Sequence, residues 1–351
     1  MWQWLLLLAL SLSPIFSHPS LGAPTYVGPA SDKEAVILWH EGQMSLGASR
    51  YQDAVNALQR YVDRYPGQAH YLKAHLLLGQ AYLELGMTQK AIPLLESCVT
   101  ASKVPLELGL HCRIELAKSY IRLKKFHEAI LLITRQTAQQ ALSIESSLPW
   151  ISHQLALLQV QALLGLDQEG NALKVWDSKL KRLPMNTPLQ ITSQASLLHL
   201  QLKIKECDHL PSTKPFLVPL HLPVPLNEAQ VQNQLERKGT CLLETLLPFQ
   251  KLLTERDLKT ANQGADELSL TFQNYLQLCT SPPASLIQVS NEMSTVQRQK
   301  YLAELTDSLI ERCRMKTEEA LRQLTSWTST LPASMKTPLT RVTHALEHGL
   351  K

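Results

Sequence analysis

The feature that most constrains this chain is a spacing of 12 residues between two small residues, which occurs three times. The pairs are Gly42 with Ala54, Gly79 with Ala91, and Ala117 with Ala129. Small residues on two neighbouring helices let the helices cross closely, so each pair predicts a helical hairpin. The three alanines are 37 and 38 residues apart, a period typical of stacked helix pairs. The spacing predicts an all-α solenoid, a fold that offers a concave surface to a partner.

The composition is that of a folded protein without a general affinity for nucleic acids. Charged residues make up 18% and hydrophobic residues 44% of the 351 residues, which is outside the range of disordered chains. The net charge is only +4 and no basic run occurs, so the electrostatic footprint of a nucleic-acid binder is missing.

The first 23 residues have the pattern of a secretory signal peptide. An apolar run from Trp2 to Leu12 is interrupted by Pro14 and Pro19, and it is too short to span a bilayer comfortably. Cleavage is expected after Ser17 or Ala23. An uncleaved anchor or a buried first helix is the alternative, because no lysine or arginine precedes the run. We expect an exported chain, periplasmic or attached to a bacterial envelope, with no membrane span once the leader is removed.

The hairpin residues resemble the tetratricopeptide repeat. That family carries a small residue and an aromatic residue on the first helix of each unit. Its second helix carries an aromatic residue, an alanine and a large apolar residue. The matching residues are Gly79, Tyr82, Ala91 and Leu95; Ala117, Tyr120, Phe126, Ala129 and Ile133; Tyr51, Ala54, Leu58, Tyr61 and Pro66; and, more weakly, Ala172, Trp176 and Pro184. Ser45 and Thr88 stand where the family usually has an aromatic residue. The resemblance covers residues 35–185 and implies a protein or peptide partner.

Composition divides the remainder of the chain. We expect the tetratricopeptide-like solenoid over residues 32–207, a proline-rich connector over 208–226 and a C-terminal helical region over 227–351, either a bundle or a continuation of the solenoid. Within the last region, helices are predicted over 228–260, 263–280 and 291–331. Pro248 is expected to break or kink the first of them, and Gly264 and Ser281-Pro282-Pro283 are expected at the turns.

The resemblance also implies which residues line the groove, because the first helix of each repeat faces inward in this family. The candidate groove-binding residues are Trp39, Gln43, Gln80, Lys118 and Gln161. Their amides and their one cation suit the backbone of an extended peptide or a partner helix. The alternative is a groove filled by the proline-rich segment or by the C-terminal helices of the same chain.

The six cysteines permit disulfides in an exported protein. Cys98 and Cys112 lie equally far from a turn near Pro105, so antiparallel helices would place them side by side and predict a bridge. Cys241 and Cys279 are a weaker pair by the same symmetry. The alternative is that these cysteines pack as free apolar residues.

No catalytic, cofactor or metal site is expected. His344, Glu347 and His348 form an H-x-x-E-H string, but this zinc-enzyme pattern needs a third ligand from later sequence. We therefore expect a protein-interaction scaffold. The alternatives are an oligomer that associates through its C-terminal helices and an enzyme with its site in that region.

Overall fold

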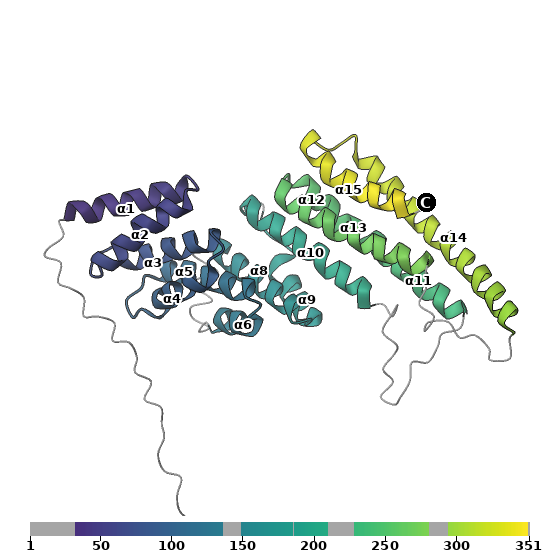
Figure 1. Ribbon diagram of the computed structural model, residues 1–351, viewed down its shortest axis with the longest axis horizontal. Helices are drawn as coiled ribbons and strands as arrows, with labels where there is room; N and C mark the ends of the chain where they lie inside the picture. Colours follow the sequence, from purple (N-terminus) through teal and green to yellow (C-terminus); the bar gives the residue numbers. More distant parts are fainter. Residues whose placement is uncertain (1–31, 136–148, 185, 210–227, 281–293, 350–351) are drawn as a thin grey trace, which may run out of the picture.

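The computed structural model describes residues 32–135, 149–184, 186–209, 228–280 and 294–349. These residues form helices and turns without a strand, so the all-α fold is confirmed. The expected signal peptide over residues 1–23, most of the connector over 208–226 and the expected turn at 281–283 lie outside the described residues. The hairpins follow one another in sequence order from α1 at one end, and the longer C-terminal helices lie at the other end (Figure 1).

The helices fall into a series of short hairpins followed by longer helices. They are α1 (Asp32–Gly47), α2 (Tyr51–Arg64), α3 (Tyr71–Glu84), α4 (Thr88–Thr100), α5 (Leu106–Arg122), α6 (Phe126–Thr134), α8 (Pro149–Gly165), α9 (Glu169–Val175) with the π-helical turn η1 (Trp176–Leu180), α10 (Leu189–His209), α11 (Glu228–Glu244), α12 (Leu246–Thr254), α13 (Leu258–Thr280), α14 (Thr295–Trp327) and α15 (Ala333–Gly349).

Close crossing within the first two hairpins depends on the glycine of the first helix. A Cβ atom added at Gly42 would lie 2.5 Å from Cγ of Leu58, and one added at Gly79 would lie 2.8 Å from Cδ2 of Leu95. Both leucines are fully buried and stand four residues beyond the alanine of their unit. The glycine of the first helix therefore receives a leucine of the second, which explains the repeated spacing.

Helix α10 joins the hairpin stack to the C-terminal helices because it is apolar on more than one face. Its Ala195 and Leu202 pack into the core formed by α8, α9 and η1. Its Leu200 and Cys207 belong to the core of α11 to α15. Two buried cores thus share one helix.

The C-terminal helices pack more extensively across the sequence than on their immediate neighbours: the largest contacts are those of α13 with α15 and of α11 with α14. The range predicted as one helix with a break or kink at Pro248, residues 228–260, holds α11, α12 and the start of α13. The first break falls at Thr245, three residues before Pro248. The turn before α13 lies at Arg256, whose φ is 61°, and Asp257 accepts a hydrogen bond from the backbone N–H of Thr260. Gly264 is buried inside α13, where an added Cβ would lie 2.6 Å from Leu252.

Three disulfides pair all six cysteines. Cys98 is bonded to Cys112, with their Cα atoms 6.1 Å apart, and so links α4 to α5. The other bonds are Cys207 with Cys241 and Cys279 with Cys313. The weaker predicted pair, Cys241 with Cys279, is wrong. Cys241 of α11 is bonded to α10, and Cys279 of α13 is bonded to α14.

Candidate protein-interaction site

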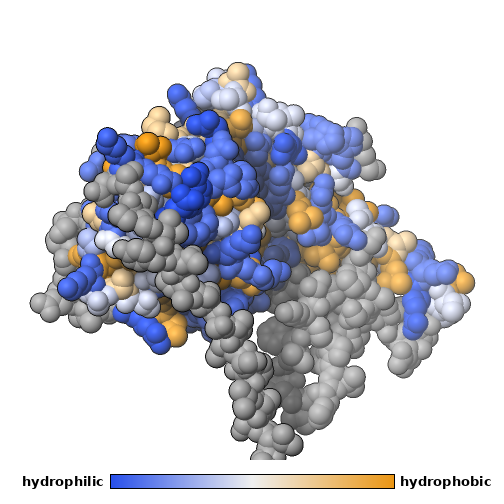
Figure 2. All heavy atoms as spheres, turned by 60° about the vertical axis from the view of Figure 1, so that its left-hand side comes forward, coloured by the Kyte–Doolittle hydropathy of each residue, from blue (hydrophilic) through white to orange (hydrophobic). Residues whose placement is uncertain are grey.

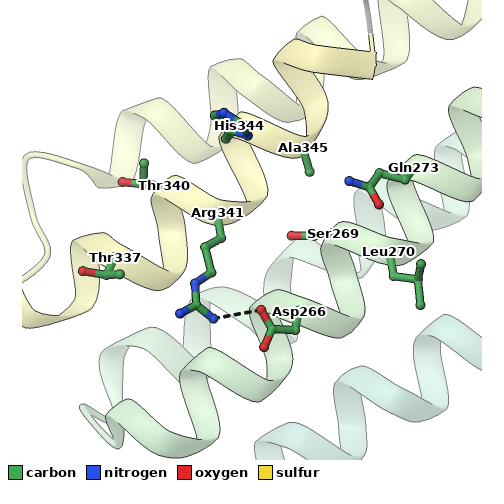
Figure 3. A pocket seen from close by; sticks show the side chains of 9 residues that line it. All are labelled: Asp266, Ser269, Leu270, Gln273, Thr337, Thr340, Arg341, His344 and Ala345. Carbon is green, nitrogen blue, oxygen red and sulfur yellow. Dashed lines mark hydrogen bonds and ion pairs between the residues drawn. The ribbon is translucent and has the colours of Figure 1, made fainter.

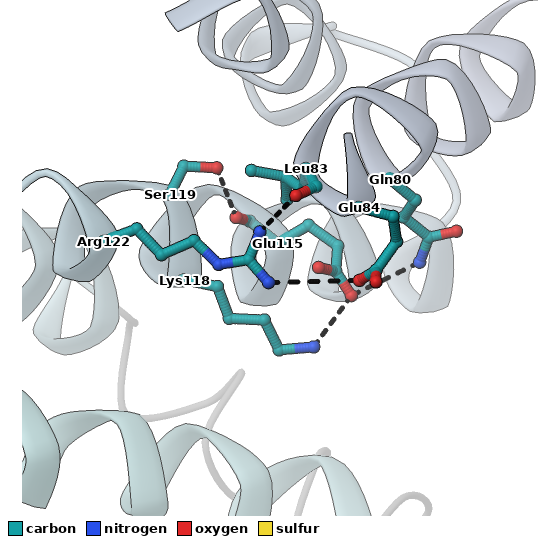
Figure 4. Close-up of polar contacts among 7 residues, drawn as sticks. All are labelled: Gln80, Leu83, Glu84, Glu115, Lys118, Ser119 and Arg122. Atoms are coloured by element: carbon teal, nitrogen blue, oxygen red, sulfur yellow. Dashed lines mark hydrogen bonds and ion pairs between the residues drawn. The ribbon is translucent and has the colours of Figure 1, made fainter. Parts of the chain in front are cut away.

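Two of the expected groove residues meet on a third residue that the sequence reasoning did not single out. Gln80 on α3 donates from Nε2 to Oε1 of Glu115 on α5 at 3.3 Å. Lys118, one turn further along α5, donates from Nζ to the same oxygen at 3.0 Å. The three side chains extend to the same side of α3 and α5 (Figure 4). We call Gln80, Glu115 and Lys118 the inner polar cluster.

A second pair of contacts continues this row toward the ends of both helices. Arg122 donates from Nη1 to the backbone oxygen of Leu83 at 2.6 Å, and its Nη2 lies 3.9 Å from Oε1 of Glu84 (Figure 4). The guanidinium therefore covers a carbonyl at the C-terminal end of α3. The side chains of Arg122 and Glu84 remain 45% and 50% exposed, so both are accessible to a ligand.

The inner polar cluster follows from spacing on a single helix. Glu115 and Lys118 are three residues apart on α5 and so lie on the same face, a signal that the sequence carries. Gln80 joins them because α5 stacks on α3. The side chain of Glu115 is only 14% exposed, whereas that of Lys118 is 33% exposed, so the carboxylate forms the floor and the cation is the more accessible group.

The other expected groove residues take different places. The prediction of Trp39 as a groove-binding residue needs correction. This residue is 6% exposed in the core of the first hairpin, and its ring stacks on that of His70 with centroids 4.7 Å apart. A large aromatic ring at this position is covered by its own hairpin and by the start of α3. Gln43 is half-buried and Gln161 is exposed. The structure brings Gln80 and Lys118 together and leaves Gln43 and Gln161 outside their hydrogen-bonded cluster.

The described C-terminal helices do not form the packing partner of this face. Helices α11 to α15 pack on one another and on α10, while α3 and α5 pack extensively on their own hairpin partners and on each other. Among the described residues, the alternative of a groove filled by the chain's own C-terminal helices therefore has no extensive contact to support it.

On a different set of contacts, tyrosines connect one hairpin to the next. Tyr82 donates its hydroxyl to Gln59 of α2 at 3.3 Å, and Tyr120 donates to Glu96 of α4 at 2.7 Å. The acceptors stand five residues beyond the alanine of the preceding unit. Burial, together with the hydrogen bond to the Glu96 carboxylate, raises the pKa of Tyr120 to about 12.

A shallow hollow of about 460 Å³ lies between α13 and α15 (Figure 3). Its most polar element is an ion pair in which Nη1 of Arg341 lies 2.9 Å from Oδ1 of Asp266. Ser269 and His344 also line it. The His344 ring contacts that of His348 at 4.0 Å between centroids. Within the described part of the chain, no group of three or more histidine, cysteine or acidic residues is placed to hold a metal ion.

Among the helices that the structure describes, none has the length and apolar character needed to cross a membrane.

The geometry defines a helical-repeat solenoid. Within it, the tetratricopeptide repeat family model matches residues 72–104, which hold nearly all of α3, all of α4 and thus Gln80 of the inner polar cluster. No curated protein matches the chain.

Two solved structures align with most of the chain. The TPR domain of P58(IPK) is 12% identical, with a TM-score of 0.24, over 91% of this chain and 99% of that one. A structure of Naa15/Naa10 bound to HypK-THB is 12% identical, with a TM-score of 0.23, over 90% of this chain and 56% of that one. The chain thus spans just over half of the second structure's chain. At these TM-scores neither likeness bears on function.

Proposed function

We propose that this protein is a protein-interaction scaffold whose α3–α5 face binds an extended peptide or a partner helix. The observation that carries the proposal is the inner polar cluster, in which Glu115 holds the donors of Gln80 and Lys118 at fixed positions on neighbouring repeats. Donors that are already ordered lose little side-chain entropy when a ligand binds.

The chemistry of the face favours a peptide backbone or an acidic side chain. Lys118 and Arg122 present cations one turn apart, and the amide of Gln80 offers both a donor and an acceptor. Because Glu115 already compensates part of the charge, we expect modest electrostatic steering and a larger contribution from directed hydrogen bonds.

We also propose that the chain is exported and acts in a periplasm or envelope. The apolar run from Trp2 to Leu12 supports export. A second, independent support is that all six cysteines are paired, since structural disulfides persist in oxidising compartments and are rare in the cytosol. An intact mass that still includes Met1, measured on protein from a cytoplasmic fraction of the native host, would contradict export.

The groove proposal is tested by photocrosslinking in the native cell. A photoreactive residue at position 80 is expected to capture a partner that mass spectrometry identifies. In the variant carrying Gln80→Glu and Lys118→Glu, binding of that partner to the purified protein is expected to fall at least tenfold. The variant has three carboxylates, at positions 80, 115 and 118, which repel one another. It also lacks the hydrogen-bond donors of Gln80 and Lys118. The helical circular dichroism should persist, because these side chains lie outside the core.

The matched control carries the same change of charge on exposed side chains outside the α3–α5 face, as Gln89→Glu with Lys103→Glu. It should bind the captured partner like the parent protein. Equal loss of binding in both double variants would show a general charge effect and would overturn the assignment of the site to α3 and α5.

A further inference from the structure

Helix α1, the first described helix of the stack, exposes the positions that the second and third repeats bury. In α3, Ala74, Leu78 and Ala81 are fully buried against the preceding hairpin. The same positions lie 37 residues earlier in α1, at Ile37, Glu41 and Met44. Here Ile37 is 62% and Met44 69% exposed, and Glu41 is exposed as well.

The third repeat shows what normally covers these positions. In α5 they are occupied by Cys112, Leu116 and Ser119, all buried. Cys112 is bonded to Cys98 of α4, so the covering element is the second helix of the preceding unit. The exposed surface of α1 is therefore the continuation of an interface that is already formed twice within the molecule.

The side chains at this end differ from those of a solvent-facing cap. Terminal repeats of solenoids carry a polar outer face for solubility, yet two of the three positions here hold large apolar residues. Val36, 55% exposed, extends the apolar surface. Figure 2 turns the N-terminal end of the molecule toward the viewer and shows separate apolar patches among mostly polar residues.

We propose that this surface of α1 binds an amphipathic helix of another protein that carries apolar, basic and apolar residues at positions i, i+4 and i+7. This pattern of three residues is taken from α2 and α4, the helices that cover the equivalent surfaces of α3 and α5. Helix α2 has Val55, Gln59 and Val62 at this spacing, and α4 has Ile92, Glu96 and Val99. In both helices the central residue accepts a hydrogen bond from the tyrosine hydroxyl of the next repeat.

The basic residue follows from Glu41, which replaces the buried leucine of the second and third repeats. The tyrosine that contacts the central residue of the covering helix corresponds to Ser45 in α1, one helical turn from Glu41. A lysine at the central position of a helix laid across α1 would therefore lie within reach of this carboxylate. A second copy of the chain fits less well, because two antiparallel α1 helices related by a two-fold axis near residue 40 would bring the Glu41 carboxylates of both copies together. Like charges at an interface oppose association.

The probe is a fluorescein-labelled peptide of residues 51–64 with Gln59→Lys, titrated with the purified protein and followed by anisotropy. Its matched partner carries Gln59→Glu. We expect the lysine peptide to bind about fivefold more tightly than the glutamate peptide. The lysine forms one exposed ion pair with Glu41, whereas the glutamate is repelled by it. In the protein variant Glu41→Lys the preference should reverse.

The variant Ile37→Ser with Met44→Ser is expected to lose binding of both peptides while keeping its melting temperature, because these side chains are exposed. No binding of either peptide to the parent protein, or equal binding of both, overturns the proposal. So does light scattering that shows a parent dimer and a monomeric double variant, since a second copy then occupies the surface. Gln80→Glu with Lys118→Glu should leave peptide binding intact, which keeps this test separate from that of the α3–α5 face.

Discussion

At the scale of single residues, the close packing of the two helices in each of the first two hairpins requires a glycine at the point of contact. Gly42 lies against Cγ of Leu58, a branch point that cannot move aside as the end of a flexible side chain can. Leu58 is itself fully buried. Gly47, at the end of the same helix, has no atom within 4 Å of an added Cβ, so one helix holds both a crowded and an open glycine.

Replacing Gly42 with alanine should therefore lower the free energy of unfolding by about 1–3 kcal/mol, the usual effect of overpacking a core. The change Gly47→Ala should be neutral or slightly stabilising, because alanine has the higher helix propensity. Urea unfolding followed by circular dichroism measures both. If the two variants lose the same stability, the contact between Gly42 and Leu58 does not limit the crossing of α1 and α2.

Between elements, the tyrosine hydrogen bonds connect each first helix to the unit before it. Tyr120 keeps its proton to a higher pH in the folded protein than in the unfolded chain, where the pKa of tyrosine is about 10. Between pH 10 and about 12 the unfolded chain releases a proton that the folded protein retains. Its contribution to stability is complete below pH 10 and is lost as the pH rises through this window.

The variant Tyr120→Phe should unfold about 1 kcal/mol more easily at pH 8, because one hydrogen bond to a carboxylate is lost. Its stability should then fall less steeply than that of the parent between pH 10 and 12. Tyr82→Phe, which removes a bond to the neutral Gln59, serves as the control with a smaller loss at pH 8. Parallel pH curves for parent and Tyr120→Phe would contradict the role of the Glu96 contact.

Elements built from local contacts were predictable from the sequence. The small residues and their aromatic neighbours predicted the hairpins because they recur within 12 residues, and Gln80 with Lys118 followed from their place on first helices. Pairings that depend on the tertiary path were not: Cys207 meets Cys241 across a segment of 34 residues. The turn before α13 was predicted after residue 260 and lies instead at Arg256. Asp257 is a common N-cap residue, but Gly264 looked like the stronger break.

On the scale of the whole molecule, the disulfides hold helices that follow one another in space. The bond between Cys98 and Cys112 closes a short loop, with a sequence separation of 14, whereas the other two close loops with a separation of 34. In the chain-entropy description, closing a longer loop restricts the unfolded chain more strongly.

Removing Cys98 and Cys112 together as alanines should cost about 3 kcal/mol of stability, and removing Cys207 with Cys241 about 4 kcal/mol. Denaturant unfolding of the oxidised proteins gives both values, with peptide mapping under non-reducing conditions to verify the remaining bonds. Recovery of Cys98 and Cys112 as free thiols from the parent protein would contradict the first bond. A larger loss for the short loop would contradict the entropic order.

The packing of α10 also restricts where repeats can be gained or lost during evolution. Because Leu202 packs into the hairpin core and Leu200 into the C-terminal core, duplication or deletion of a unit that includes α10 leaves one of the two cores without its wall. Among the described helices, α1 to α6 pack extensively on the helices of other hairpins and not on α10, whereas α8 and α9 pack on α10. Gain and loss of repeats should therefore concentrate between α1 and α6, while α8, α9, α10 and the helices that follow them are inherited as one block.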